Sequence, residues 1–458
     1  MIRCRAASAK PPFAVLLLLA IVAIWPRVVY AVDIDAAELE RRLALERRVA
    51  EIDRALFAEL VRLATFNVHF HLEANRHQKW RDITYPIARE SGTALGFAAT
   101  LIDTRQQVKG LDKPSDASRE ALRKAVTCAI VGNAISGGAS ALELAQNTWM
   151  ELKARREAYS PGRSLAFVKS IVANTNRLLD ARAQLADEVL LPERRRVIQL
   201  ETHLIRRIRQ QLLFEFGTWS CHSRDLAWRE NTFYTIDSLQ NFTRMCAAII
   251  TMNAFGNLKL GRSATVCALV GNSAATINPI LRNFVGIAVR KHQERKLARE
   301  IPFERTGESP ELDDLQQKLT TEVAESWLRK VAALSYRTEK IDAELDREVK
   351  EIERYRQVAQ QQSVSGPLIG LTGVASSTLA TVAVYDYLQE PKTAIRLGLA
   401  GRITQGTGQA LALMITPYTT IKGIISQHRL KKRGELPSQI LSERLKRIEL
   451  LEREQSRN

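Results

Sequence analysis

The stretch Thr127–Asn133 (TCAIVGN) recurs 139 residues later as Val266–Asn272 (VCALVGN), with five of seven residues identical. Both copies lie in apolar, glycine-containing segments of helix length. An internal repeat of this kind predicts supersecondary units that bury their apolar faces against one another. We therefore expect the repeated motif to set the architecture of the chain.

A second echo precedes each copy of the motif. Trp80–Tyr85 (WRDITY) corresponds to Trp228–Phe233 (WRENTF), at an offset of 148 residues. The nine-residue difference between the two offsets falls in the connection between paired apolar segments, which is long at 103–124 and short at 258–263. Length variation confined to a loop is typical of a duplication. We interpret the two cycles as duplicated.

The chain divides into three cycles of one layout, each with a charged amphipathic arm, a pair of small-residue apolar helices and a basic cluster. A serine cap followed by proline predicts helix starts at Ser160-Pro161 and Ser309-Pro310. The third cycle rests on layout rather than on identity. The predicted segments are a signal peptide at 1–31, repeats at 32–156, 160–299 and 309–433, and a C-terminal helix at 434–458.

No run of residues alternates as a β-strand would, and Pro, Gly and Ser separate pieces of helix length. The predicted fold class is all-α, with long, coiled-coil-like amphipathic arms alternating with Gly/Ala/Ser-rich apolar helical hairpins. The apolar segments are expected at about 91–103 and 120–150, 243–258 and 263–290, and 364–386 and 394–426.

Small residues recur at every fourth position of the apolar segments, as in Cys128, Gly132 and Ser136. This spacing puts them on one helix face, where two backbones can approach closely. An asparagine in an apolar helix needs a hydrogen-bond partner, which we expect on a neighbouring helix. We assign a helix-packing role to Cys128, Gly132, Asn133, Cys267, Gly271 and Asn272.

Five cysteines in 458 residues do not form a disulfide framework. Cys4 would leave with the signal peptide. Cys128 and Cys267 are expected to pack as small hydrophobes, with a meeting across a pseudo-symmetry axis as the alternative. The sequence leaves open whether Cys221 pairs with Cys246.

The first 31 residues are typical of an export signal. A basic start is followed by an uninterrupted apolar run from Phe13 to Trp25, and Val29-Tyr30-Ala31 offers a cleavage site. An uncleaved N-terminal anchor is the alternative. Cleavage would begin the mature chain at Val32.

The chain is basic, with a formal net charge of +17. Removal of residues 1–31 leaves 63 basic and 50 acidic residues, a net charge of +13. Such a balance favours an anionic partner, and export makes anionic membrane surfaces or envelope polymers better candidates than nucleic acid. The competing interpretation is that the charge runs are solvated helix faces.

Two interpretations of the apolar segments remain open, bilayer insertion and a buried soluble core. Residues 363–385 contain no charge, which is long enough to span a bilayer, and two further uncharged runs at 125–142 and 264–281 are at the lower limit. Against insertion stand the two asparagines, Pro279, the Ser and Thr content and the first apolar helix of the first cycle, which is expected to be only about 11 residues long.

The sequence carries no catalytic motif that we trust. His69, His71 and His77 lack equivalents in the second copy, so we predict no metal site there. Gly256–Ser263 resembles a phosphate-binding loop, but it joins two helices instead of following a strand. We predict no enzyme activity, no cofactor and no metal.

We therefore expect an exported, non-enzymatic helical protein that acts as a membrane-associated or envelope scaffold through helix–helix assembly, with homo-oligomerisation as one form of that assembly. The alternatives are a soluble extracytoplasmic bundle with a structural or binding role and a pore-forming or membrane-disrupting protein.

Overall fold

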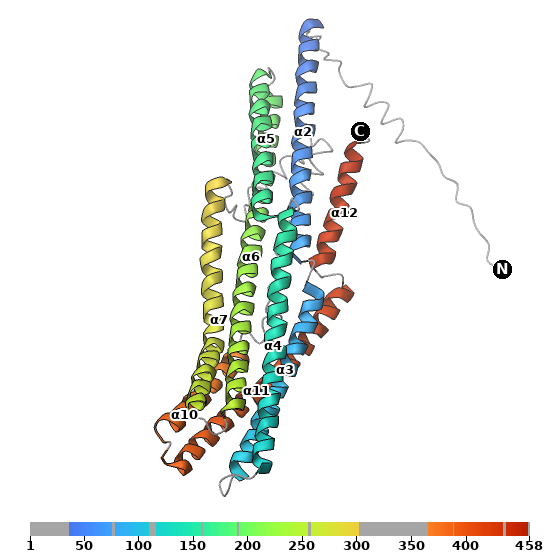
Figure 1. Cartoon of the computed structure of the whole chain (residues 1–458). Helices are drawn as coiled ribbons and strands as arrows, with labels where there is room; N and C mark the ends of the chain where they lie inside the picture. Colours follow the sequence, from blue (N-terminus) through green and yellow to red (C-terminus); the bar gives the residue numbers. More distant parts are fainter. Residues whose placement is uncertain are drawn as a thin grey trace, which may run out of the picture. The chain divides into compact units, whose positions relative to one another are not determined.

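The computed structural model describes residues 36–75, 78–109, 116–156, 159–189, 192–254, 258–301, 365–387, 389–433 and 437–456. Every regular element in these ranges is an α-helix, so the all-α prediction is confirmed there (Figure 1). The predicted signal peptide and the third arm, which begins at Ser309-Pro310, lie outside the described residues.

The helices in the described ranges are α2 (Ala36–Asn75), α3 (Gln78–Lys109), α4 (Asp116–Arg156), α5 (Pro161–Glu188), α6 (Pro192–Asn253), α7 (Leu258–Glu300), α10 (Ser365–Tyr385), α11 (Pro391–Arg433) and α12 (Pro437–Ser456). The chain divides into two compact units, Met1–Ile52 and Asp53–Asn458. The contacts that build the site all belong to the second unit.

Proline begins four of these helices, at Pro161, Pro192, Pro391 and Pro437. Proline suits the first helical turn because its missing N–H would have no intrahelical partner there. At the first of them, the Ser160 side chain caps the helix by accepting a hydrogen bond from the backbone N–H of Arg163, at 3.4 Å. The predicted helix start at Ser160-Pro161 is confirmed, and α12 lies within the C-terminal segment for which a helix is predicted, 434–458.

Six helical segments form a closed ring, which we call the hairpin bundle. It consists of α3, α4, residues 226–253 of α6, residues 258–289 of α7, α10 and α11. The consecutive pairs α3–α4, α6–α7 and α10–α11 pack together, and contacts of α4 with α6, α7 with α10 and α11 with α3 join the pairs. The ring therefore closes on itself, which positions side chains from all six helices around one interior.

A second group of helices, the arm bundle, has an ordinary hydrophobic core. It consists of residues 53–75 of α2, α5, residues 192–225 of α6, residues 290–301 of α7, and α12. Phe66 lies with its ring centroid 4.5 Å from Phe167 and 6.2 Å from Phe216, which joins α2, α5 and α6. Buried aliphatic residues such as Val168 and Leu213 complete the core. Burial of this apolar surface holds the arm bundle together.

Helix α3 is much longer than the apolar run that marks it in the sequence. It contains 32 residues and continues through Pro86 and the adjacent charges Arg89 and Glu90. The expected segment of about 11 residues is thus only the uncharged part of the helix. The charges are accommodated because Arg89 is buried against polar groups of other helices.

Candidate functional site

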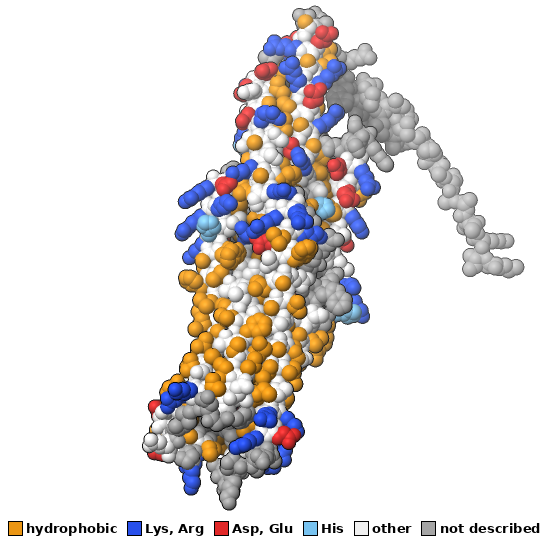
Figure 2. All heavy atoms as spheres, viewed as in Figure 1, with side chains coloured by type: hydrophobic (Ala, Val, Ile, Leu, Met, Phe, Trp, Pro, Cys, Tyr) orange, Lys and Arg blue, Asp and Glu red, His pale blue; other side chains and the backbone are white. Residues whose placement is uncertain are grey.

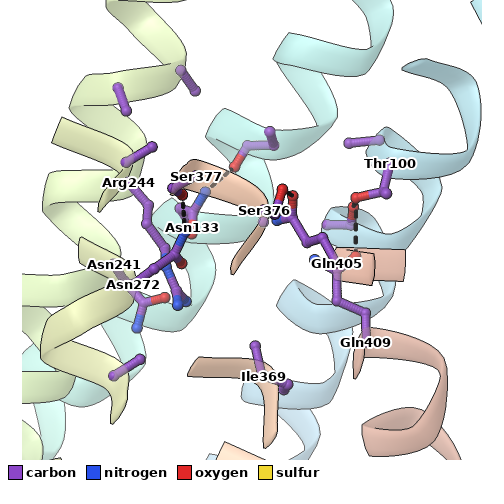
Figure 3. A pocket seen from close by; sticks show the side chains of 18 of the residues that line it. Thr100, Asn133, Asn241, Arg244, Asn272, Ile369, Ser376, Ser377, Gln405 and Gln409 are labelled. Carbon is purple, nitrogen blue, oxygen red and sulfur yellow. Dashed lines mark hydrogen bonds between the residues drawn. The ribbon is translucent and has the colours of Figure 1, made fainter. Parts of the chain in front are cut away.

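A cavity of about 490 Å³ lies inside the hairpin bundle and is lined by residues of all six helices (Figure 3). Much of its wall consists of glycine and alanine, including Gly92, Gly96 and Ala129. Small side chains leave the space, and amide, hydroxyl and guanidinium groups point into it from between them. An interior of this size is within the range of small-molecule sites.

The hairpin bundle is polar inside and apolar outside, the reverse of an ordinary soluble core. Large hydrophobic side chains lie exposed along its outer surface, where Figure 2 shows them as a continuous apolar zone. Among them are Val131, Leu142, Leu239, Phe242, Val266, Val270, Ile280, Phe284, Ile403, Leu411, Met414 and Ile421. The buried side chains of the same helices include Arg89, Ser136, Ser140, Asp237, Gln240, Asn241, Asn272, Asn278, Ser377, Gln409 and Thr416.

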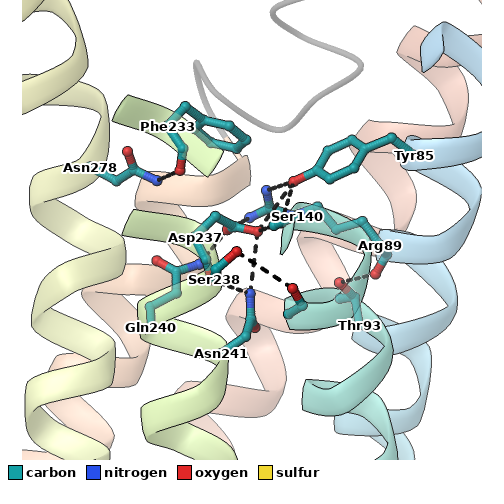
Figure 4. Close-up of polar contacts among 11 residues, drawn as sticks. Tyr85, Arg89, Thr93, Ser140, Phe233, Asp237, Ser238, Gln240, Asn241 and Asn278 are labelled. Atoms are coloured by element: carbon teal, nitrogen blue, oxygen red, sulfur yellow. Dashed lines mark hydrogen bonds and ion pairs between the residues drawn. The ribbon is translucent and has the colours of Figure 1, made fainter. Parts of the chain in front are cut away.

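A buried carboxylate, Asp237 of α6, ties α3, α4 and α6 together (Figure 4). Arg89 forms an ion pair with its Oδ1 atom at 3.0 Å, and the hydroxyls of Ser140 and Tyr85 donate to Oδ2 at 2.5 and 3.2 Å. Gln240 and Asn241 supply two further amide donors. Five donors therefore meet one carboxylate, which satisfies its acceptor capacity.

A second ion pair lines the cavity between α3 and α11. Arg402 Nε lies 2.6 Å from Asp103 Oδ2, and Gln405 Oε1 accepts a weaker bond from the same guanidinium at 3.4 Å. Thr100 donates to Gln409 Oε1 at 3.0 Å on the same helix pair. These contacts help to close the ring where its last helix returns to its first.

Arg244 of α6 also lines the cavity, but its guanidinium is not matched by a carboxylate of its own (Figure 3). Its Nε and Nη2 atoms are buried and have no hydrogen-bond partner within the described part of the chain. The acid that interacts electrostatically with it is Asp237, which already receives the five donors. A buried guanidinium without partners is costly and calls for an explanation.

The two repeat asparagines make different contacts. Asn272 of α7 donates to the Gly373 carbonyl at 3.0 Å and to Ser377 Oγ at 2.6 Å, both on α10. Asn133 of α4 donates to Ala129 O of its own helix at 2.8 Å. Both line the cavity, so the neighbour that we expected exists for Asn272, whereas Asn133 turns back to its own backbone.

The two repeat glycines lie at close helix contacts. A Cβ atom added at Gly132 would lie 2.7 Å from the Gly92 carbonyl oxygen of α3, and one added at Gly271 would lie 2.9 Å from Cγ of Arg244 and 3.0 Å from the Gln240 carbonyl of α6. The first glycine therefore permits two backbones to touch. The second makes room for the arginine side chain to run along α7.

All cysteines of the described residues are free, namely Cys128, Cys221, Cys246 and Cys267. The two repeat cysteines are half-buried, and the pairing of Cys221 with Cys246 that the sequence left open does not occur. Burial raises the pKa of the Cys221 thiol to about 11, which makes it a poor nucleophile at neutral pH.

The histidine region contains a buried imidazole packed on a tryptophan. The His71 and Trp219 ring centroids are 3.5 Å apart in the arm bundle, and burial, with His222 and Arg444 nearby, lowers the pKa of His71 to about 3. Within the described residues, no group of three or more His, Cys, Asp and Glu side chains could hold a metal ion. Of the sequence at 256–263 that resembles a phosphate-binding loop, residues 258–263 form the start of α7, and residues 256–257 lie outside the described residues.

Sequence reasoning did not identify the residues that form the main polar contacts and charges inside the hairpin bundle, which are Tyr85, Arg89, Asp237 and Arg244. A signal for the first three exists in the repeat. At the 148-residue offset, Tyr85 corresponds to Phe233 and Arg89 to Asp237, and in both cases the structure brings the equivalent residues together. Extending the alignment from the tryptophans would have found opposite charges at one repeat position.

No protein family, curated protein or solved structure matches this chain. Fold and site together define the class to which it can be assigned, an all-α protein in which a closed ring of six helices surrounds a polar cavity.

Proposed function

We propose that this chain is an exported, integral membrane protein of the cell envelope, in which the hairpin bundle spans the bilayer and the arm bundle stands outside it as a non-enzymatic scaffold for helix-mediated assembly. The inverted polarity of the hairpin bundle carries this proposal. Lipid tails favour an apolar exterior, and polar side chains inside a membrane protein face the bundle interior.

Helix length and composition support insertion. Among the described residues, three stretches are long and apolar enough to cross a membrane, with mean hydropathy of 1.4, 1.3 and 1.6. They are 119–188, which covers α4 and α5 with residues 157–158 outside the described ranges, Lys259–Glu300 and Gly366–Tyr385. In α11, residues 403–421 are uncharged. At 1.5 Å per residue, runs of 18 to 20 residues approach the ~30 Å of a bilayer core.

Basic residues flank the apolar zone, as Figure 2 shows. The last turns of α4 and α11 carry Lys153, Arg155 and Arg156, and Lys431, Lys432 and Arg433, and α7 continues into the run 290–299. Such clusters are suited to anionic lipid headgroups. These lipid headgroups would be the anionic partner that the net charge of the chain favours.

The repeat also has a place in this proposal. If the first two cycles are duplicated units, α3–α4 and α6–α7 are related hairpins, and the Arg89–Asp237 pair joins equivalent positions of the two. The third pair, α10–α11, then closes the ring between them. Each hairpin alone would leave polar groups in lipid, so the three need one another.

Extraction of membranes that contain the full chain tests the proposal. We expect the protein to stay in the pellet after washing with alkaline carbonate and to require detergent for release. Release by carbonate would reduce the protein to a peripheral role, and a monodisperse soluble protein without detergent would overturn the proposal.

A further inference from the structure

We propose that the cavity of the hairpin bundle is a binding site for a small organic anion with one carboxylate, and that Arg244 is the residue that pairs with it. The location of this site inside a membrane rests on the proposed function. Binding itself depends only on the ring of six helices and on its cavity, and can be measured on purified protein.

When the ion pairs at the cavity are counted, one arginine is left without a carboxylate of its own. Arg89 is paired with Asp237 at 3.0 Å, and Arg402 is paired with Asp103 at 2.6 Å. Arg244 is the third arginine of the lining, and Asp103, which is paired with Arg402, is the one acidic residue in the lining as the described residues form it. One surplus positive charge in a low-dielectric interior favours a single negative charge and disfavours a polyanion.

The guanidinium of Arg244 has the donors that a carboxylate needs. Its Nε and Nη2 atoms, both buried and without a hydrogen bond among the described residues, lie on one edge of the planar group. That edge matches the two oxygens of a carboxylate in the bidentate arrangement that arginine favours. A buried arginine with this edge unused is preorganised for such a ligand, because no internal bond has to be broken first.

Further polar groups of the cavity restrict the kind of ligand that it can bind. Gln405 and Gln409 also line the cavity, and their Oε1 atoms accept hydrogen bonds from Ser376 and Arg402 and from Thr100, respectively. Two buried acceptors, Gln240 Oε1 and Asn278 Oδ1, have no donor in the same part of the chain. Water that enters with the ligand can supply those donors.

A volume of about 490 Å³, with walls of alanine and glycine between these groups, exceeds what a halide ion fills. It admits an organic body of several carbon atoms. The site therefore favours a small carboxylate over an inorganic ion.

Matched pairs of acids and amides test the proposal on the full chain in detergent. The probes are acetate, butyrate and benzoate, each compared with acetamide, butyramide and benzamide at constant ionic strength, with binding followed by calorimetry. We expect at least one carboxylate to bind with a stoichiometry near one and its amide to bind at least tenfold more weakly. Equal binding of acid and amide, or no binding of any acid, would overturn the proposal.

Variants of Arg244 assign the effect to the residue. Arg244→Gln should remove the preference for the acid, Arg244→Lys should keep part of it, and the exposed Arg290→Gln should leave it unchanged. An unchanged preference in Arg244→Gln would refute the role of the arginine. Because a buried unpaired charge is removed, Arg244→Gln should also raise the thermal midpoint in carboxylate-free buffer, which shows that the variant is folded. Carbonate extraction is independent of this binding, so failure of either proposal can be told from failure of the other.

Discussion

The arm bundle and the hairpin bundle share two continuous helices, α6 and α7, yet the two regions distribute polarity in opposite ways. In the arm bundle, aromatic and aliphatic side chains form the core and most charged side chains face outward. In the hairpin bundle, leucine, isoleucine and phenylalanine face outward, and arginine, aspartate and amides are buried. Each of these two helices therefore changes its environment along its length. The boundary between the two patterns is where we place the membrane surface.

Both bundles bury charge, but they use it differently. In the arm bundle, Arg182 is fully buried and bonds to Asp53 at 2.6 Å, to Glu201 at 2.5 Å and to the Ile198 carbonyl. This group fixes three helices in one arrangement. In the hairpin bundle, Arg244 is left with unused donors next to a cavity. The saturated charge of Arg182 holds helices together, whereas the unused donors of Arg244 need an explanation, and we propose a ligand.

The largest effect should follow from breaking the saturated charge of the arm bundle. Arg182→Ala leaves Asp53 and Glu201 buried without their cation, and we expect a loss of about 3–5 kcal/mol in the free energy of unfolding. Arg447→Ala removes a half-exposed arginine that lies 4.0 Å from Glu443 on α12, and it should cost less than about 1 kcal/mol. Denaturant titration followed by circular dichroism measures both. Similar losses would mean that the Arg182 group does not hold the arms together.

An arginine on the outer face tests the hairpin bundle next. Val270 is 56% exposed near the middle of the uncharged part of α7, and Leu450 is 57% exposed on α12. Val270→Arg should cost about 2.5–3.5 kcal/mol of insertion energy and lower the carbonate-resistant fraction, because it places a charge in hydrocarbon. Leu450→Arg is a surface change within about 0.5 kcal/mol. If neither substitution lowers the carbonate-resistant fraction, the outer faces of both α7 and α12 lie in water.

Glycine contacts within the hairpin bundle should give a smaller effect. Gly132→Ala forces a Cβ atom to within 2.7 Å of the Gly92 carbonyl, whereas a Cβ atom at Gly138 meets nothing within 4 Å. We expect the first change to destabilise the protein by about 1–3 kcal/mol, because backbones must shift. The second should be neutral or stabilising by up to about 1 kcal/mol, because glycine is entropically unfavourable in a helix. Thermal midpoints in detergent compare the two, and equal midpoints would remove the packing role of Gly132.

The smallest effect concerns pH and is confined to the arm bundle. The pKa of His71 falls from 6.5 to about 3 on folding, so the unfolded chain binds a proton that the folded chain refuses. The stability that comes from keeping His71 neutral is fully present above about pH 6.5. As the pH falls from there toward 3, the free energy of unfolding decreases by about 1.4 kcal/mol per pH unit. Between pH 7.5 and 5.5 the protein should lose about 1.4 kcal/mol from this residue.

Replacement of the imidazole isolates this contribution. His71→Phe keeps a ring against Trp219 and should flatten the pH dependence of the unfolding free energy, whereas His203→Gln on the exposed surface should not. A slope that persists in His71→Phe would assign the pH dependence to other groups.

Local signals in the sequence predicted much of the helix layout. Serine and proline at 160–161 act through their own backbone geometry, so the start of α5 was readable, and Pro437 marked the last helix in the same way. The small-residue spacing drew attention to Gly132 and Gly271, and a Cβ atom added at either glycine would lie 2.7 to 3.0 Å from atoms of a neighbouring helix. These signals depend on residues that are near one another in the chain.

The interior of the hairpin bundle could not be read in this way. Asp237 meets Tyr85 and Arg89 across about 150 residues, and single-sequence patterns do not report pairings at that distance. Arg182 was missed for the same reason, because its partners Asp53 and Glu201 lie on two other helices. The closing of α11 onto α3 depends on all six helices at once.

Whether the outer face of the hairpin bundle lies in lipid can be measured directly. A nitroxide label on a single cysteine at position 270, in protein reconstituted into vesicles, reports collisions with oxygen, which concentrates in lipid, and with a water-soluble nickel chelate. The account predicts high oxygen and low nickel accessibility at position 270 and the reverse at position 450 on α12. Equal nickel accessibility at the two positions would contradict it.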